Sequence, residues 1–110
     1  MIRVECSISI LHNEKKFLDA CKIALLQKVL EHKSLRAAAL ELRISYQHAW
    51  NLVTEMNSEA PHILVKKQRG GSHGGGAYIT EYGLRVIREY EILNTHMQLF
   101  IEKINSEIRF

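Results

Sequence analysis

Residues 34–57 read SLRAAALELRISYQHAWNLVTEMN, and this stretch contains two successive apolar repeats of helical period. Ser34 stands before the first repeat and Ser45 before the second, where a serine hydroxyl can accept a hydrogen bond from an unpaired amide of the first helical turn. The expected buried residues are Leu35, Ala38, Ala39 and Leu42 on the first helix and Ala49, Leu52, Val53 and Met56 on the second. Two helices joined by so short a turn have the outline of a helix-turn-helix.

In a helix-turn-helix the second helix enters the major groove of DNA and presents the side chains of its N-terminal part to the base edges. The expected DNA contacts of this helix are Ser45, Tyr46, Gln47, His48 and Asn51. Gln47 and Asn51 can each pair with an adenine edge, and Arg36 on the preceding helix can reach a phosphate. Three-helix bundles that bind no DNA contain similar segments, so the flanking sequence has to decide.

Two aromatic residues of the second helix, Tyr46 and Trp50, can have roles other than base contact. Trp50 lies beside Ala49 near the apolar stripe, and we expect it to pack against the helices. Tyr46 is open to two interpretations, because its hydroxyl can reach a phosphate oxygen or its ring can cover the edge of the core.

Residues 69–77 read RGGSHGGGA and hold five of the chain's six glycines. A phosphate-binding loop is excluded, because no Lys-Ser or Lys-Thr follows these glycines, and the G-x-G-x-x-G pattern between a strand and a helix is also absent. Residues 63–68 and 77–80 are typical of short strands, which makes the glycines the tip of a β-hairpin. A hairpin tip with no ligand is the alternative to a tip that lies along a nucleic-acid backbone.

The charge around this hairpin favours the nucleic-acid reading. The chain has a formal net charge of +3, and no acidic residue occurs between Glu59 and Glu81. A glycine-rich tip without Cβ atoms can approach a sugar-phosphate backbone closely, and lysine and arginine attract the phosphates. The hairpin is thus predicted to be a wing that binds DNA through Lys66, Lys67, Arg69, Gly71, Ser72 and His73.

The remaining segments complete a winged helix-turn-helix, a mainly α fold with a small β-hairpin. Residues 2–10 alternate apolar and polar side chains, which predicts a half-buried leading strand. A first helix is expected over residues 17–32, with Leu18, Cys21, Leu25 and Val29 on its apolar face. Pro61 should end the third helix. Residues 1–80 then form the DNA-binding unit, and residues 81–110 form a C-terminal dimerisation helix of the same domain.

The final helix, expected from Glu81 to about Glu107, carries an apolar seam with alternating steps of four and three residues. The seam consists of Val86, Tyr90, Leu93, Met97, Phe100 and Ile104. Such a helix would be about 40 Å long, so its C-terminal half needs another surface to cover the seam. A second copy of the chain is the expected partner, and a two-fold dimer would bind an inverted repeat. The alternative is a helix that folds back over the chain's own leading strand.

Composition excludes several other classes of protein. With 46% hydrophobic and 25% charged residues, the chain of 110 residues should fold as one domain. It contains neither an apolar run long enough to cross a bilayer nor a signal peptide, so a cytoplasmic location is expected. Cys6 and Cys21 are too few for a disulfide framework and are expected to be buried. The histidines lack metal-binding spacing, and no catalytic motif occurs, so we expect no metal, no cofactor and no enzymatic activity.

These residues resemble the N-terminal DNA-binding domain of the molybdate-responsive transcriptional regulators of the ModE type, which are related to the LysR-type helix-turn-helix proteins. The resemblance rests on Ser45, Tyr46, Ala49 and Trp50, on the glycine-rich wing, and on the T-x-x-G pattern of Thr80 and Gly83. It implies a sequence-specific DNA-binding regulator that forms two-fold dimers.

The chain also departs from this family. It ends at Phe110 without residues for a molybdate-binding domain, so oxyanion sensing is not expected, and a separate effector-binding protein is one route of control. Gln47 and His48 stand where the family often has basic residues, and Arg43 replaces a common glycine. A winged helix that binds another protein instead of DNA is therefore the alternative function.

Overall fold

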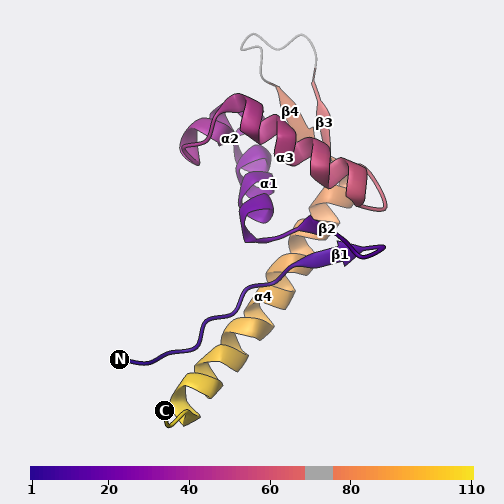
Figure 1. Ribbon diagram of the computed structural model, residues 1–110. Helices are drawn as coiled ribbons and strands as arrows, with labels where there is room; N and C mark the ends of the chain where they lie inside the picture. Colours follow the sequence, from indigo (N-terminus) through magenta and orange to yellow (C-terminus); the bar gives the residue numbers. More distant parts are fainter. Residues whose placement is uncertain (69–75) are drawn as a thin grey trace.

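The computed structural model describes residues 1–68 and 76–110, and it confirms the winged helix expected from the sequence (Figure 1). The helices are α1 (Ala20–His32), α2 (Leu35–Glu41), α3 (Tyr46–Glu59) and α4 (Glu81–Glu107). The strands are β1 (Ile10–His12), β2 (Lys15–Leu18), β3 (Val65–Lys67) and β4 (Ala77–Ile79). They form two antiparallel hairpins, β1–β2 and β3–β4.

Local capping defines the helix-turn-helix, as predicted. The Ser34 hydroxyl accepts a hydrogen bond from the Ala37 amide at 3.0 Å, and the Ser45 hydroxyl accepts one from the His48 amide at 3.0 Å. Between α2 and α3, Arg43 adopts a left-handed conformation with φ of 59°. This conformation is the one that glycine adopts most readily, which explains why Arg43 is an unusual residue at this turn.

The core lies where α1, α2 and α3 meet. Its fully buried side chains come from all three helices and include Leu25, Leu26, Val29, Leu35, Ala38, Ala49, Val53 and Met56. Alanines on α2 and α3 let these two short helices pack closely. Leu42 and Leu52, which were expected in the core, are only half-buried at its edge.

The expected leading strand over residues 2–10 is wrong for most of its length. Residues 2–9 have no strand partner among the residues that the structure describes, and β1 begins only at Ile10. Asn13 and Glu14 form a two-residue turn with φ of 51° and 66°, and the chain returns as β2. Apolar alternation reflects an extended backbone, but a strand also needs a partner for its backbone groups. The helix expected from residue 17 consequently starts at Ala20.

Both cysteines are exposed, contrary to expectation. Cys6 lies on the unpaired N-terminal segment, and Cys21 lies in the first turn of α1 on the side away from the core. The apolar face of α1 is instead formed by Ile23, Leu25 and Leu26 together with Val29.

Helix α4 has the bounds that the sequence predicts, and its C-terminal half projects from the body of the molecule (Figure 1). Its buried residues, Gly83, Ile87 and Tyr90, all lie in its first ten positions. The radius of gyration of 16.1 Å exceeds the roughly 13 Å of a compact domain of this length. Within the described ranges, no helix is both long and apolar enough to span a membrane.

The N-terminal segment runs beside this projecting half of α4 (Figure 1). The Asn105 side chain pairs with the backbone of Val4 in both directions: its Oδ1 accepts from the Val4 amide at 2.6 Å, and its Nδ2 donates to the Val4 carbonyl at 3.1 Å. The Tyr90 hydroxyl donates to the Ile8 carbonyl at 3.2 Å. The alternative in which α4 lies against the chain's own N-terminal segment is therefore realised in part.

Candidate DNA interface

Helix α3 presents a row of polar side chains without lysine or arginine to solvent. Gln47, His48 and Asn51 are exposed, while Ala49 and Val53 on the opposite side anchor the helix in the core. The Gln47 amide nitrogen donates to the Asn51 amide oxygen at 3.1 Å. Sequence reasoning missed Thr54, which is exposed and continues the same row one turn further along. Its spacing of three residues from Asn51 is the signal that identifies it.

Tyr46 joins α3 to α2. Its ring is half-buried and packs against the core, which realises the core-edge interpretation of this residue. The Arg36 guanidinium lies over the ring, with its central carbon 4.3 Å from the ring centroid. The predicted phosphate contact Arg36 is thus held beside the N-terminal turn of α3.

Trp50 joins α3 to the wing hairpin. It is half-buried against the core, as expected for a packing residue, and it meets Tyr46 edge to face at 6.2 Å between centroids. The Lys67 ammonium lies 4.9 Å from the centroid of the Trp50 ring. Side chains from α2, α3 and β3 therefore form one continuous row, Arg36, Tyr46, Trp50 and Lys67.

Asn57 attaches β3 to α3, a role that sequence reasoning did not assign. Its side-chain nitrogen donates to the Val65 carbonyl at 2.9 Å. Its side-chain oxygen accepts hydrogen bonds from the amides of Leu64 at 2.9 Å and Val65 at 3.3 Å. The sequence signal for this contact is an asparagine near the end of a helix, and the identity of its partners is a tertiary property.

The two lysines of β3 lie on opposite faces of the wing hairpin. In the register, Val65 faces Ile79, Lys66 faces Tyr78 and Lys67 faces Ala77. Both lysines are exposed, but side chains alternate along a strand, so Lys67 shares the face of buried Val65, toward Trp50 of α3, while Lys66 points the other way. Arg69, Gly71, Ser72 and His73, the other predicted wing contacts, lie outside the described residues.

Ion pairs brace the other side of the helix-turn-helix. The Lys28 ammonium lies 2.9 Å from a Glu41 carboxylate oxygen and 3.2 Å from one of Glu31, and His32 also contacts Glu41. Hydrogen bonds to Glu41 and Glu31 raise the pKa of Lys28, and those from Lys28 and His32 lower the pKa of Glu41. Potential metal ligands of Glu31, His32 and Glu41 approach one another within 4.8 Å, but the Lys28 ammonium already contacts both carboxylates. These ion pairs connect α1 to α2.

Comparison with known proteins shows which regulators this chain resembles in sequence. No family model matches the chain. Its sequence is 37% identical over 106 residues to the DNA-binding transcriptional dual regulator ModE of Escherichia coli strain K12. The aligned residues make up 96% of this chain and 40% of that protein. The chain is 32% identical to the transcriptional regulator ModE of Yersinia pestis, with the same coverage of 96% and 40%. The chain is homologous to the N-terminal region of the ModE-type regulators.

The homology covers only part of each relative. A molybdenum transport protein ModE of Azotobacter vinelandii is 32% identical over 91 residues, which are 83% of this chain and 34% of that protein. The chain thus spans between a third and two fifths of the length of these relatives. The match to the ModE-type N-terminal region confirms the resemblance seen in the sequence.

The T-x-x-G pattern on which the ModE-type resemblance rests has a structural explanation. The Thr80 hydroxyl caps α4 by accepting from the Gly83 amide at 3.0 Å, and it donates to the Ile63 carbonyl at 2.7 Å. A Cβ atom on Gly83 would lie 2.5 Å from the Leu64 carbonyl oxygen and 2.6 Å from the Ile79 side chain. Position 83 therefore requires glycine so that α4 can start directly against β3 and β4.

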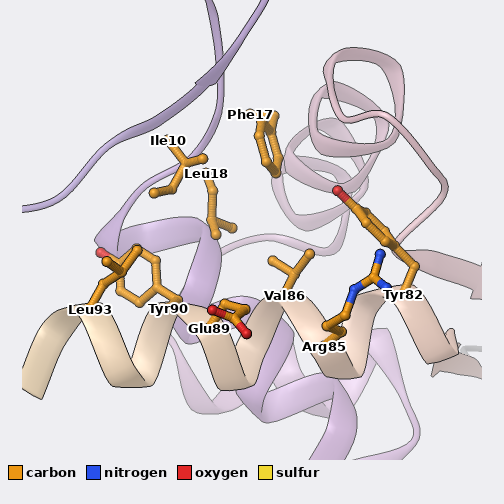
Figure 2. Close-up of a pocket in the computed structure, with 9 residues that line it drawn as sticks. All are labelled: Ile10, Phe17, Leu18, Tyr82, Arg85, Val86, Glu89, Tyr90 and Leu93. Carbon is orange, nitrogen blue, oxygen red and sulfur yellow. The ribbon is translucent and has the colours of Figure 1, made fainter.

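The chain also has an apolar hollow along α4 (Figure 2). Val86, Tyr90 and Leu93 from the predicted seam line it on one side, facing the β1–β2 hairpin across the hollow. The hairpin contributes Ile10, Phe17 and Leu18. Further along the seam, Met97 and Ile104 are half-buried, while Leu93 and Phe100 remain 43% and 58% exposed.

Proposed function

We propose that this chain binds double-stranded DNA sequence-specifically and regulates transcription. In this proposal α3 enters the major groove, and the wing lies on the adjoining backbone. The observation that carries the proposal is a pair of neighbouring rows of side chains along α3. Exposed amides of Gln47 and Asn51 form one row, and the ring-held cations Arg36 and Lys67 form the other. Polar amides suit base edges, and cations beside them suit the phosphates that border a groove.

The hydrogen bond between Gln47 and Asn51 favours adenine at one position of the site. One of the two N–H groups of the Gln47 amide is used in this bond, while the Gln47 oxygen remains as an acceptor and the Asn51 nitrogen as a donor. Adenine offers the complementary pair in the major groove, an N6 donor and an N7 acceptor. Replacement of Gln47 by alanine should relax the preference at this position and cost about 1–3 kcal/mol on the best site.

We further propose that two copies form a two-fold dimer through α4 and the N-terminal segment. Besides Leu93 and Phe100, Ile92 and Leu99 on the same half of the helix are 51% and 60% exposed. Residues 2–9 have no strand partner in the described part of the chain, so those of their backbone groups that do not bond to Asn105 or Tyr90 can pair with a second copy. Burial of these groups would remove apolar surface from water. Such a dimer would bind an inverted repeat with half-sites about 34 Å apart.

Selection of bound duplexes from a random pool tests the DNA proposal. We expect enrichment of an inverted repeat with adenine in each half-site. Affinity should fall steeply with salt, because each phosphate contact contributes about 0.9 to the slope of log affinity against log salt. A pool that stays random, or binding that does not depend on salt, would contradict the proposal and favour the protein-interaction alternative.

A further inference from the structure

We propose that Tyr46 and Trp50 are positioning residues that hold Arg36 and Lys67 as a pair of phosphate contacts along one edge of α3. This inference rests on the DNA-binding function proposed above. The two rings then have a role beyond packing. They, and not carboxylates, are the groups that hold the two cations in place.

The geometry gives each cation its own ring. The Arg36 carbon lies 4.3 Å from the Tyr46 centroid, and the Lys67 nitrogen lies 4.9 Å from the Trp50 centroid. Both distances are within the range in which the negative face of an aromatic ring attracts a cation. Tyr46 and Trp50 are four residues apart on α3, so the two cations stand about one helical turn apart.

The same geometry leaves the cations available to phosphate. A guanidinium that lies over a ring uses its flat face, and its N–H donors point outward from its edge. Lys22 and Lys28 pair with glutamates, whereas Arg36 and Lys67 form no ion pair within the described ranges. Their charge is therefore not neutralised by a carboxylate before DNA arrives.

The two cations also lie on the side of α3 where DNA phosphates would stand. Gln47 follows Tyr46 in the chain, and Asn51 follows Trp50, so the amide row lies about 100° around the helix from the ring row. When the amides face the floor of the groove, the rings face one of its walls. Phosphates of one strand form that wall, within reach of Arg36 and Lys67.

Packing alone does not require aromatic rings at these positions. A leucine offers an apolar side chain of smaller volume to the core, but it has no ring quadrupole to attract a cation. Phenylalanine retains a ring face of smaller size. The comparison of phenylalanine with leucine at position 50 therefore separates a positioning role from a packing role.

The test measures the salt dependence of binding to the selected duplex by wild type, Trp50→Phe, Trp50→Leu, Lys67→Met and the Trp50→Leu/Lys67→Met double variant. We expect Trp50→Phe to keep the wild-type slope. Trp50→Leu and Lys67→Met should each be shallower by about 0.9, equivalent to about a fivefold loss of affinity at 0.15 M salt. The double variant should lose no more than either single one. A wild-type slope in Trp50→Leu, or fully additive losses, would overturn the inference.

A second measurement needs no DNA, and it is made on variants whose urea unfolding midpoint matches that of wild type. Trp50 is the chain's single tryptophan, so its fluorescence reports on the Lys67 contact. Lys67→Met should change the emission of the free protein, whereas Lys66→Met, on the opposite face of β3, should leave it unchanged. Equal emission in wild type and Lys67→Met would overturn the inference. If wild type binds no duplex, the DNA-binding proposal fails, and the emission still decides whether the ring holds the cation.

Discussion

Asn57 offers the sharpest test of how the wing is attached to α3. In the structure this side chain makes three hydrogen bonds to the backbone of Leu64 and Val65, at 2.9, 2.9 and 3.3 Å. Leu64 is 0% and Val65 3% exposed, so water does not replace a lost partner without rearrangement of the chain. We therefore predict that Asn57→Ala loosens β3 from α3 and lowers the free energy of unfolding.

The size of the loss follows from these contacts. Each of the two short hydrogen bonds contributes about 1 kcal/mol net, and buried backbone groups left without a partner add a further cost of about 1 kcal/mol or more. The expected loss is about 3 kcal/mol, a large part of the roughly 5–15 kcal/mol that stabilises a typical domain. Asn57→Asp retains the acceptor for the two amides and loses only the donor to the Val65 carbonyl, so it should lie between wild type and Asn57→Ala.

Urea denaturation measures the loss, and amide hydrogen exchange localises it. Exchange at the Leu64 and Val65 amides should accelerate in Asn57→Ala, because these are the groups that the side chain protects. Ser58→Ala is the matched control, since Ser58 is the next residue and is exposed. A loss below about 1 kcal/mol, or unchanged exchange at both amides, would refute this account of the attachment.

Three further predictions concern the start of α1, the start of α4 and the dimer. Gly83→Ala should destabilise the fold in urea by about 1–3 kcal/mol despite the better helix propensity of alanine, because the new Cβ would meet the Leu64 carbonyl at 2.5 Å; a gain in stability would contradict this packing. Burial raises the pKa of Asp19, but hydrogen bonds from the Lys22 amide and the Lys16 side chain outweigh this effect and lower it overall. The stabilising contribution of the Asp19 carboxylate is therefore complete above about pH 4 and is lost as the pH falls through the lowered pKa. In urea titrations, the free energy of unfolding should fall more steeply with acid in wild type than in Asp19→Asn. Equal declines would contradict the lowered pKa. In sedimentation, Leu93→Lys with Phe100→Lys should convert a dimer to a monomer. The control Thr95→Lys, about 200° around α4 from Leu93, should remain a dimer. A monomeric wild type at micromolar concentration would exclude the dimer.

Sequence reasoning succeeded where structure depends on near neighbours. The caps Ser34, Ser45 and Thr80 act within three residues of their partners, and each begins its helix as predicted or as the resemblance implied. The β1–β2 hairpin was missed because its turn contains Glu14, an uncommon residue at a positive φ, where glycine is the usual signal. The leading strand was overextended because alternation shows which side chains share a face but does not supply a pairing partner.

The sequence by itself determined the helix-turn-helix, the wing strands and the length of α4, because capping and apolar periodicity act over a few residues. Only the tertiary structure decided which residues act together at the candidate interface. It separated Lys66 from Lys67, placed Lys67 on Trp50 and Arg36 on Tyr46, and joined Asn57 to β3. These contacts connect segments that are distant in the sequence, and their partners are set by the packing of α2, α3 and β3 around the shared core, which no local pattern of residues encodes.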